Sequence, residues 1–285
     1  MKTYNVCWSG GVDSTFIVTQ LSQFPIIIRP FYIKGQTFRL SEPYEMAAIT
    51  AIRELLLADP RTQADLLPVT IIEKDDPRIK DREIVNAHRC IYMRLLQGYK
   101  TNHNGKLPPA GSQQIYADGA FVSPQYVSCA SLAKYLNEPI EIGLLRDDFE
   151  DNPSFSYLSD LLRFMTDDIT DRCLMYVCES EQDRDCSTLF KEFRFPIAGQ
   201  KMYKKDVWNW YSEHDYLQVR SRTNFCQDPV VRVDGTIEPC GICTACIGVI
   251  REKVLEPFTE EGLARYKDYE DNHEKEPERF RLKGF

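Results

Sequence analysis

Residues 3–15 read TYNVCWSGGVDST and lead from a short apolar run, through two glycines, into a helix-like segment. A strand, a glycine-rich turn and a helix in this order direct backbone N–H groups and a helix N-terminus at one point, and both favour an anion. Gly10 and Gly11 let the backbone approach a ligand closely, because neither carries a Cβ. The stretch therefore predicts a phosphate-binding loop.

The polar side chains of the loop fit the same interpretation. Ser9, Ser14 and Thr15 add hydroxyl groups, and Asp13 suits a phosphate site if it caps the helix or helps to hold a metal ion on the phosphates. The fingerprints G-x-x-x-x-G-K-[ST] and G-x-G-x-x-G are both absent. A plain Gly-Gly turn capped by Asp or Ser is the simpler alternative, and it leaves the remaining residue types of the loop without a reason.

The composition limits the classes of protein that the chain can belong to. It has 285 residues, 43% of them hydrophobic, and a formal net charge of -8. The acidic balance argues against broad nucleic-acid binding, although a local basic groove stays compatible with it. No apolar stretch is long enough to span a bilayer, and the N-terminus does not resemble a signal peptide. Ten cysteines without such a signal point to a reducing, cytoplasmic location.

The pattern of apolar residues predicts an α/β fold. Strands are expected at residues 2–8, 26–33, 69–72, 115–117 and 140–142, and helices at 14–23, 42–58, 81–99 and 124–137. This alternation implies a mostly parallel sheet with helices on both faces, with ligands at the carboxyl ends of the strands. Further along, SYLSDLLRFMTDDI (156–169) has the apolar spacing of a helix, and ESEQDRDC (179–186) that of a solvated loop.

These elements suggest a division of the chain into four regions. Residues 1–145 form the expected nucleotide-binding core, and residues 146–188 an insertion with a lid or interface role. Residues 189–258 complete the core and contain a cysteine cluster. Residues 259–285 are dense in charge and predict a solvated helix with a loosely held tail.

Four of the ten cysteines occupy one short window with the spacing C-x13-C-x2-C-x2-C. They are Cys226, Cys240, Cys243 and Cys246. Four thiolates suit a closed, structural zinc site, and an iron–sulfur cluster is the alternative that thiolates alone do not separate from it. The other cysteines, expected in the core or the insertion, are Cys7, Cys90, Cys129, Cys173, Cys178 and Cys186. A second metal site at the last three would lack an evident fourth ligand.

The pattern Ser-Gly-Gly-x-Asp-Ser after a first strand resembles the pyrophosphate loop of the ATP pyrophosphatase superfamily. With the cysteine cluster near the C-terminus, the chain resembles the 7-cyano-7-deazaguanine synthase family. Three weaker matches lie between these motifs, at Phe31–Gln36, at Asn86–Arg89, and at Phe195–Ile197 followed by Lys204 and Lys205. The chain departs from the family in its extra length at 100–113 and 146–188, in the long Cys226–Cys240 gap, and in Val12, which is usual in sulfur-transfer and amidation relatives.

The resemblance implies an adenine-nucleotide α-hydrolase-like, Rossmann-like three-layer fold with a small zinc knuckle. It implies that ATP, with Mg²⁺, activates the carboxylate of 7-carboxy-7-deazaguanine as an acyl adenylate. Ammonia then gives the amide, and a second adenylation gives the nitrile. Nucleotide contacts are expected from Ser9, Gly10, Gly11, Val12, Asp13, Ser14, Thr15, Lys34 and Gln36, with Asp13 or Ser14 near Mg²⁺. Zn²⁺ would lie in the cysteine cluster.

Four further residues are candidates for contact with substrate. Arg89 could meet a carboxylate or phosphate, and Lys205 or Lys204 could stabilise charge on the adenylate. Asp118 follows the expected fourth strand, where ligands of α/β proteins bind. Each has an ordinary alternative: a surface arginine, a solvated lysine and a turn-forming aspartate.

Several functions stay open at this point. The first is the nitrile-forming ligase, with free ammonia and a homodimer expected. A divergent relative that amidates a deazaguanine or joins it to another acceptor is the second. A tRNA-modifying enzyme would want a basic face, which the net charge does not favour. A non-catalytic zinc protein would leave the loop without purpose.

Overall fold

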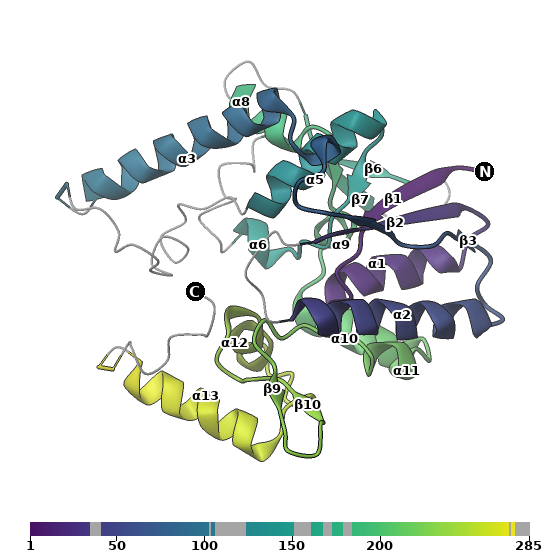
Figure 1. The fold of residues 1–285 in the computed structure, drawn as a ribbon, viewed down its shortest axis with the longest axis vertical. Coiled ribbons are helices and arrows are strands. Elements are labelled where there is room, and N and C mark those ends of the chain that lie inside the picture. The colour runs from purple at the N-terminus through teal and green to yellow at the C-terminus, as the bar shows by residue number, and fades with distance from the viewer. Residues whose placement is uncertain are drawn as a thin grey trace. The chain divides into compact units, whose positions relative to one another are not determined.

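The computed structural model divides the chain into two compact units (Figure 1). It describes residues 1–34, 41–102, 104–105, 124–150, 161–167, 173–178, 184–273 and 275–276. Unit 1 contains Met1–Trp8, Ile17–Gln36 and Pro60–Tyr203, and unit 2 contains Ser9–Phe16, Thr37–Asp59 and Lys204–Phe285. Helix α1 (Val12–Ser22) begins in unit 2 and continues in unit 1.

Unit 1 is built on a mixed sheet of eight strands, most of them parallel. Its path runs β3-β2-β1-β5-β8-β7-β6, and β4 also pairs with β2. The strands are β1 (Thr3–Cys7), β2 (Ile27–Ile33), β3 (Asp65–Leu66), β4 (Thr70–Ile72), β5 (Ile140–Glu141), β6 (Leu162–Thr166), β7 (Cys173–Val177) and β8 (Phe193–Arg194). Only the β6–β7 and β7–β8 pairs are antiparallel. The predicted α/β class with a mostly parallel sheet is confirmed.

Strand β1 has neighbours on both sides and a buried backbone. Tyr4, Asn5 and Val6 are all buried, although they point alternately to the two faces of the sheet. Continuous burial is typical of a central parallel strand that is covered on both faces. Asn5 donates from Nδ2 to the Pro139 carbonyl at 3.2 Å, which satisfies its buried amide.

The helices of unit 1 bury an apolar core against this sheet. They are α3 (Arg82–Asn102), α5 (Pro124–Leu136), α6 (Asp147–Glu150), α8 (Arg184–Phe190) and α9 (Pro196–Gly199), with a 3₁₀ turn at Pro77–Ile79. Helix α3 buries Ile84, Ala87 and Ile91, which share one face, and it lies beside α8 (Figure 1). The helices predicted at 14–23, 81–99 and 124–137 are confirmed, and the strand predicted at 115–117 lies outside the described residues.

The helix predicted at residues 156–169 is wrong in the part that is described. Residues 162–166 form strand β6, which pairs with β7 from Leu162 opposite Val177 to Thr166 opposite Cys173. Leu161, Leu162 and Met165 have helical spacing, but the backbone pairs with its neighbour instead, so tertiary contacts override the local pattern. The loop expected at 179–186 also ends early, because α8 begins at Arg184.

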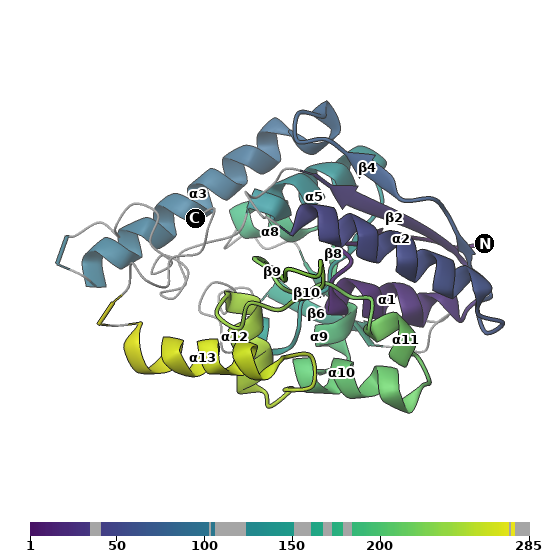
Figure 2. The same cartoon turned by 60° about the horizontal axis from the view of Figure 1, so that its bottom comes forward.

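Unit 2 gathers segments that are far apart in the sequence. Its helices are α2 (Glu42–Ala58), α10 (Lys204–Glu213), α11 (Leu217–Arg220), α12 (Thr244–Arg251) and α13 (Glu260–Asn272). Its strands β9 (Val230–Val231) and β10 (Ile237–Glu238) form an antiparallel hairpin. Figures 1 and 2 show α10 and α11 side by side, and α11 also contacts α2. The helix predicted at 42–58 is confirmed.

Among the described residues, no helix combines the length and the apolar character that a membrane span requires.

A substitution at Gly199, at the end of α9, tests how closely this helix packs on β7. A Cβ at this position would lie 2.4 Å from the Cys173 carbonyl oxygen and 2.8 Å from the Met175 nitrogen, both of them backbone atoms. We expect Gly199→Ala to lower the free energy of unfolding by about 1–3 kcal/mol, because neither atom can turn away. Urea titration followed by circular dichroism measures this.

The matched control is Gly98→Ala in α3, where a Cβ meets no atom within 4 Å. Alanine favours a helix by about 1 kcal/mol over glycine, so this variant should equal or exceed the wild type in stability. Equal effects of the two substitutions would contradict the close packing of α9 on β7.

Candidate functional site

The loop Ser9–Thr15 leads into the first turn of helix α1. Gly11 supplies the carbonyl that accepts the first helical bond, from the Thr15 N–H at 3.0 Å. The N–H groups of the first turn have no acceptor inside a helix. Two hydroxyls brace the turn, since Ser9 N–H donates to Ser14 Oγ at 3.1 Å and the two Oγ atoms are 3.0 Å apart. The arrangement can receive an anion.

Gly10 holds the loop against α2. Its φ is +72°, and a Cβ would lie 2.7 Å from the Glu45 carbonyl oxygen and 3.2 Å from Ala48 Cβ. No other residue type can occupy this position without moving the helix. The Gly10 carbonyl accepts a hydrogen bond of 2.9 Å from the Asn224 N–H. The loop is therefore held from two sides by segments of unit 2.

Helix α10 brings a lysine to the loop. Lys204, its first residue, forms an ion pair with Asp13 Oδ2, and the two side chains are 14% and 24% exposed. Tyr211, two turns further on, donates from its hydroxyl to the Val12 carbonyl at 2.9 Å. Phe16 and Trp210 add an edge-to-face contact with ring centroids 5.0 Å apart. These contacts hold α10 against the start of α1.

The second carboxylate oxygen of Asp13 has an unusual environment. Asp13 Oδ1 is buried and has no hydrogen-bond partner among the described residues. A buried acceptor without a donor costs about 1–3 kcal/mol, and such atoms are rare in native proteins. The oxygen lies at the first turn of a helix, and Lys204 contacts the other oxygen of the same carboxylate. A bound cation or donor would satisfy it.

The other predicted residues lie at different places. The backbone N–H of Lys205 donates to Glu252 at 2.7 Å, and its side chain is exposed; Lys204 is the lysine that contacts the loop. Arg89 is exposed on α3 in unit 1. Lys34, at the end of β2 in unit 1, lies 3.7 Å from Glu73 Oε1. Gln36 and Asp118 lie outside the described residues.

Sequence reasoning missed Asn224 and Tyr211. Each contacts the loop through one backbone carbonyl, and neither belongs to a motif with a fixed spacing. Val12 and Thr15 are fully buried, so within the loop they contribute packing and backbone rather than exposed side chains.

A cleft of about 430 Å³ lies close to the loop within unit 2. One wall is a face of α2 with Tyr44, Ala47 and Ala51, and the other includes Arg222 and Asn224. Its volume is typical of small-molecule sites. Because Asn224 lines the cleft and also bonds to Gly10, the cleft and the loop share a residue.

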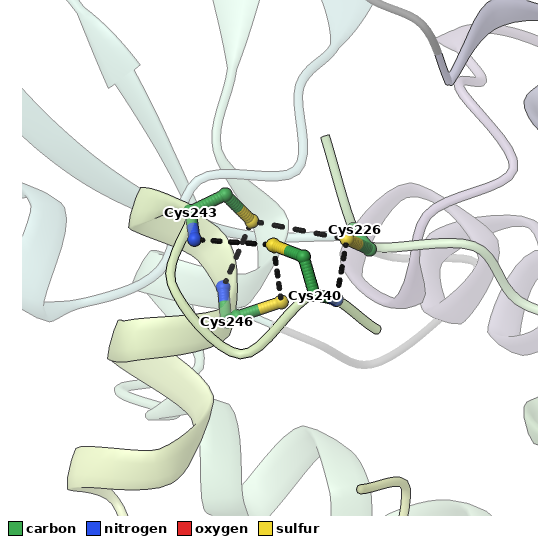
Figure 3. A group of neighbouring side chains, drawn as sticks. All are labelled: Cys226, Cys240, Cys243 and Cys246. Atoms are coloured by element: carbon green, nitrogen blue, oxygen red, sulfur yellow. Dashed lines mark hydrogen bonds between the residues drawn. The ribbon is translucent and has the colours of Figure 1, made fainter. Parts of the chain in front are cut away.

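The four predicted cysteines meet in one cluster (Figure 3). Cys226, Cys240, Cys243 and Cys246 are all buried, and their sulfurs lie within 4.8 Å of one another. The Sγ separation is 4.0 Å for Cys226 and Cys243, and 3.9 Å for Cys240 and Cys246. Four thiolates at about 2.3 Å around one tetrahedral ion stand about 3.8 Å apart, so the cluster could hold a metal ion such as zinc.

Backbone N–H groups point at three of the sulfurs. The donors are Cys240 to Cys226 Sγ at 3.2 Å, Cys243 to Cys240 Sγ at 3.3 Å and Cys246 to Cys243 Sγ at 3.4 Å. Hydrogen bonds from the neighbouring thiols, that of Cys226 first, lower the pKa of Cys243. The pKa of Cys246 is raised by its own hydrogen bonds with the other three thiols, Cys226 first, and by burial. Four thiols this close cannot all ionise unless a cation takes up their charge.

The spacing of the sulfurs favours one ion over an iron–sulfur cluster, whose thiolates bind different iron atoms and stand farther apart. Among the described residues, this is the only group of His, Cys, Asp and Glu side chains close enough to hold a metal. The described side chains of Cys173, Cys178 and Cys186 form no such group.

Glu238 joins the cysteine cluster to helix α13. Its carboxylate is buried and accepts from Arg232 at 2.6 Å, from Arg265 at 2.9 Å and from Thr259 at 2.9 Å. Burial acts to raise the pKa of Glu238, but these donors, Arg265 first, hold it at about 2. Arg265 also donates from Nε to the Cys240 carbonyl at 2.8 Å. The network thus fixes α13 on the knuckle.

Gly241 allows α13 to approach that closely. Its φ is +84°, and a Cβ would lie 2.3 Å from the Gly262 carbonyl oxygen. Thr259 caps α13 by accepting the Gly262 N–H at 3.1 Å. Helix α13 therefore begins with its backbone against the turn that carries Cys240 and Cys243.

No model of a known protein family matches this chain, and no curated protein matches it significantly.

We expect the purified chain to contain one zinc ion. Cys243→Ser should lose most of the metal and lower the melting temperature, because a structural site needs all four thiolates and its binding energy is folding energy. Elemental analysis and thermal unfolding measure the two effects. Cys90→Ser, which changes an exposed thiol on α3, is the control and should keep the ion. Stoichiometric iron, or a metal content unaffected by Cys243→Ser, would refute the zinc assignment.

The stability of the chain should depend on Glu238 in acid. The folded pKa of about 2 lies below the ordinary glutamate pKa of 4.5, so the contribution of Glu238 is complete above about pH 5 and is lost as the pH falls toward 2. Glu238→Gln should cost about 1–3 kcal/mol near pH 7 and less at low pH. Urea unfolding at several pH values measures this.

Glu261 provides the matched control for Glu238. It also lies beside Arg232, at 3.1 Å, but its side chain is 67% exposed, so Glu261→Gln should change stability little at any pH. A constant loss in Glu238→Gln between pH 7 and pH 3 would mean that the charge of Glu238 is not the cause.

Proposed function

We propose that this chain is an ATP-dependent enzyme that adenylates the carboxylate of a deazapurine and then transfers nitrogen to it. The observation that carries the proposal is Asp13, whose Oδ1 is buried at the first turn of α1 and finds no hydrogen-bond partner in the described part of the chain. A carboxylate oxygen is a preferred ligand of Mg²⁺, and unpaired N–H groups favour phosphate oxygens. The loop offers both within one turn of helix.

The residues of the loop fit a nucleotide with a metal ion on its phosphates. Asp13 would hold the ion through Oδ1, and Ser14 lies within the same turn. Mg²⁺ offsets negative charge on the phosphates. The chain itself supplies the helix N-terminus, the hydroxyls of Ser9 and Ser14, and the ammonium of Lys204. The likeness of this loop to the pyrophosphate loops of ATP pyrophosphatases supports ATP as the nucleotide.

Lys204 takes the role that the sequence suggested for either of two lysines. Its charge is balanced by Asp13. Phosphate oxygens near Asp13 would give the ammonium new acceptors, so Lys204 can stabilise the charge that develops on the α phosphate. Lys205, whose side chain is exposed, would contribute little.

In the proposed reaction a substrate carboxylate oxygen attacks the α phosphorus of ATP, and the bond to the pyrophosphate oxygen breaks. Ammonia then attacks the acyl carbon, and AMP leaves with the C–O electron pair, which gives the amide. A second ATP adenylates the amide oxygen, and loss of AMP and protons gives the nitrile. The protein positions groups and neutralises charge, and needs little acid–base chemistry.

The resemblance to 7-cyano-7-deazaguanine synthases supports 7-carboxy-7-deazaguanine as the substrate. The mostly parallel sheet and the cysteine cluster agree with an adenine-nucleotide α-hydrolase-like fold and a zinc knuckle. A homodimer belongs to the same proposal. Val12 and the departures in length favour, as the second candidate, a relative that stops at the amide or joins the deazaguanine to another acceptor.

The test is incubation with ATP, Mg²⁺, ammonium and 7-carboxy-7-deazaguanine. We expect AMP, pyrophosphate and the nitrile or amide, detected by mass spectrometry. Lys204→Ala should lower the rate roughly 100-fold, because it removes a charge next to the reacting phosphate. Lys205→Ala, one residue away and exposed, is the matched control and should retain nearly full activity.

Three outcomes would count against this proposal. AMP formation that needs tRNA in place of the deazapurine would favour a tRNA-modifying enzyme. Equal rates for the two lysine variants would remove Lys204 from the reaction. No AMP with any acceptor, together with unchanged nucleotide binding in Asp13→Ala, would leave a metal-stabilised protein without this activity.

A further inference from the structure

Two cysteines outside both sites lie next to each other in unit 1. The sulfurs of Cys7 and Cys129 are 3.5 Å apart. Cys7 is the last residue of β1, and Cys129 lies in the middle of α5. The chain separates them by more than a hundred residues, so the fold alone brings the two thiols together. Neither takes part in the loop or in the metal cluster.

The two thiols differ in how a small reagent can reach them. Cys129 is 2% exposed and lies in the apolar core, whereas Cys7 is only half-buried at the edge of that core. Because Cys129 donates to Cys7 and is buried, its pKa lies well above the usual range. An oxidant therefore reaches Cys7 first, and Cys129 stays a protonated thiol beside it.

We propose that Cys7 and Cys129 form a reversible disulfide when the chain meets a peroxide. The Cys7 sulfur attacks one peroxide oxygen, the O–O bond breaks, and Cys7 becomes a sulfenic acid as water leaves. The Cys129 sulfur then attacks the Cys7 sulfur, an S–S bond forms, and the hydroxyl leaves as a second water with the Cys129 proton. Two thiols lose two electrons in total, and the peroxide is reduced to two waters.

The geometry favours this bond over further oxidation of Cys7. A disulfide has an S–S length of about 2.05 Å, so the sulfurs need to approach by about 1.5 Å from the 3.5 Å of the reduced pair. A resolving thiol in van der Waals contact captures a sulfenic acid before a second peroxide arrives. In a reducing compartment the pair remains reduced until an oxidant appears.

A disulfide at Cys7 would affect the loop Ser9–Thr15, because Cys7 is close to it in the chain. Only Trp8 separates it from Ser9, the first residue of the loop, and the Trp8 N–H bonds to the Phe31 carbonyl at 2.9 Å. A shift of Cys7 toward α5 moves the end of β1, and the loop follows it in the chain. The expected effect on activity, a fall of roughly tenfold or more in AMP formation, rests on the function proposed above.

The experiment uses the full chain, reduced and loaded with zinc. It is treated with hydrogen peroxide in steps, blocked with N-ethylmaleimide, digested without reductant and analysed by mass spectrometry. We expect a linked peptide containing Cys7 and Cys129 that dithiothreitol separates. A zinc-responsive dye identifies the peroxide doses at which the cysteine cluster is still intact, and only these doses are compared.

Three single variants make the result specific. Cys7→Ser and Cys129→Ser should give no linked peptide, whereas Cys90→Ser, which removes an exposed thiol on α3, should give the wild-type amount. Reductant should restore the AMP formation of oxidised wild type, and Cys7→Ser should retain its activity in peroxide. If Cys7→Ser fails to fold, Cys129→Ser still tests whether the linked peptide needs this pair of cysteines.

Two results would overturn the proposal. One is the oxidation of Cys90, or of Cys7 to a sulfinic acid, at doses that give no linked peptide. The other is a linked peptide that forms equally in urea-unfolded protein, since proximity in the fold would then not be its cause. A chain without AMP-forming activity in the reduced state would refute the proposed function and leave the disulfide to be judged by the peptides alone.

Discussion

The close approach of the Gly10 backbone to helix α2 determines the shape of the loop Ser9–Thr15. A Cβ at Gly10 would lie 2.7 Å from the Glu45 carbonyl oxygen, and the positive φ of the residue turns the chain into α1. With the loop held there, Asp13 meets Lys204. The glycine is thus needed for packing against protein, and the conformation of the loop and the start of α1 follow from it.

Local features of the sequence predicted most elements of the core and the cysteine cluster. Alternation of apolar runs located most strands and helices of the core, and the cysteine spacing predicted the cluster, because each depends on residues that are near in sequence. The helix predicted at residues 156–169 was wrong, in the part that is described, for the opposite reason. Their helical spacing was local, but the partner that makes residues 162–166 a strand is β7. Pairing between distant segments leaves little trace in the spacing of one of them.

The same distinction applies to the candidate site. Glycines and hydroxyls of the loop were found because they form a pattern, whereas Asn224 and Tyr211 bond to backbone carbonyls that any residue offers. Lys204 and Lys205 were equivalent as sequence. Helix α10 separates them, because adjacent residues in a helix point about 100° apart and only one of them can meet Asp13. Which of two adjacent lysines meets Asp13 can therefore be decided only from the three-dimensional structure.

The cysteine cluster and the loop are connected through one short segment of unit 2. Asn224 donates its N–H to Gly10 and its side-chain amide to the Cys226 carbonyl at 3.4 Å, and Cys226 belongs to the cluster. A metal ion that fixes Cys226 therefore also fixes the residue that holds Gly10. A closed four-thiolate site has no open position for chemistry. A metal ion held there would order a segment that has little regular secondary structure of its own, and with it the loop.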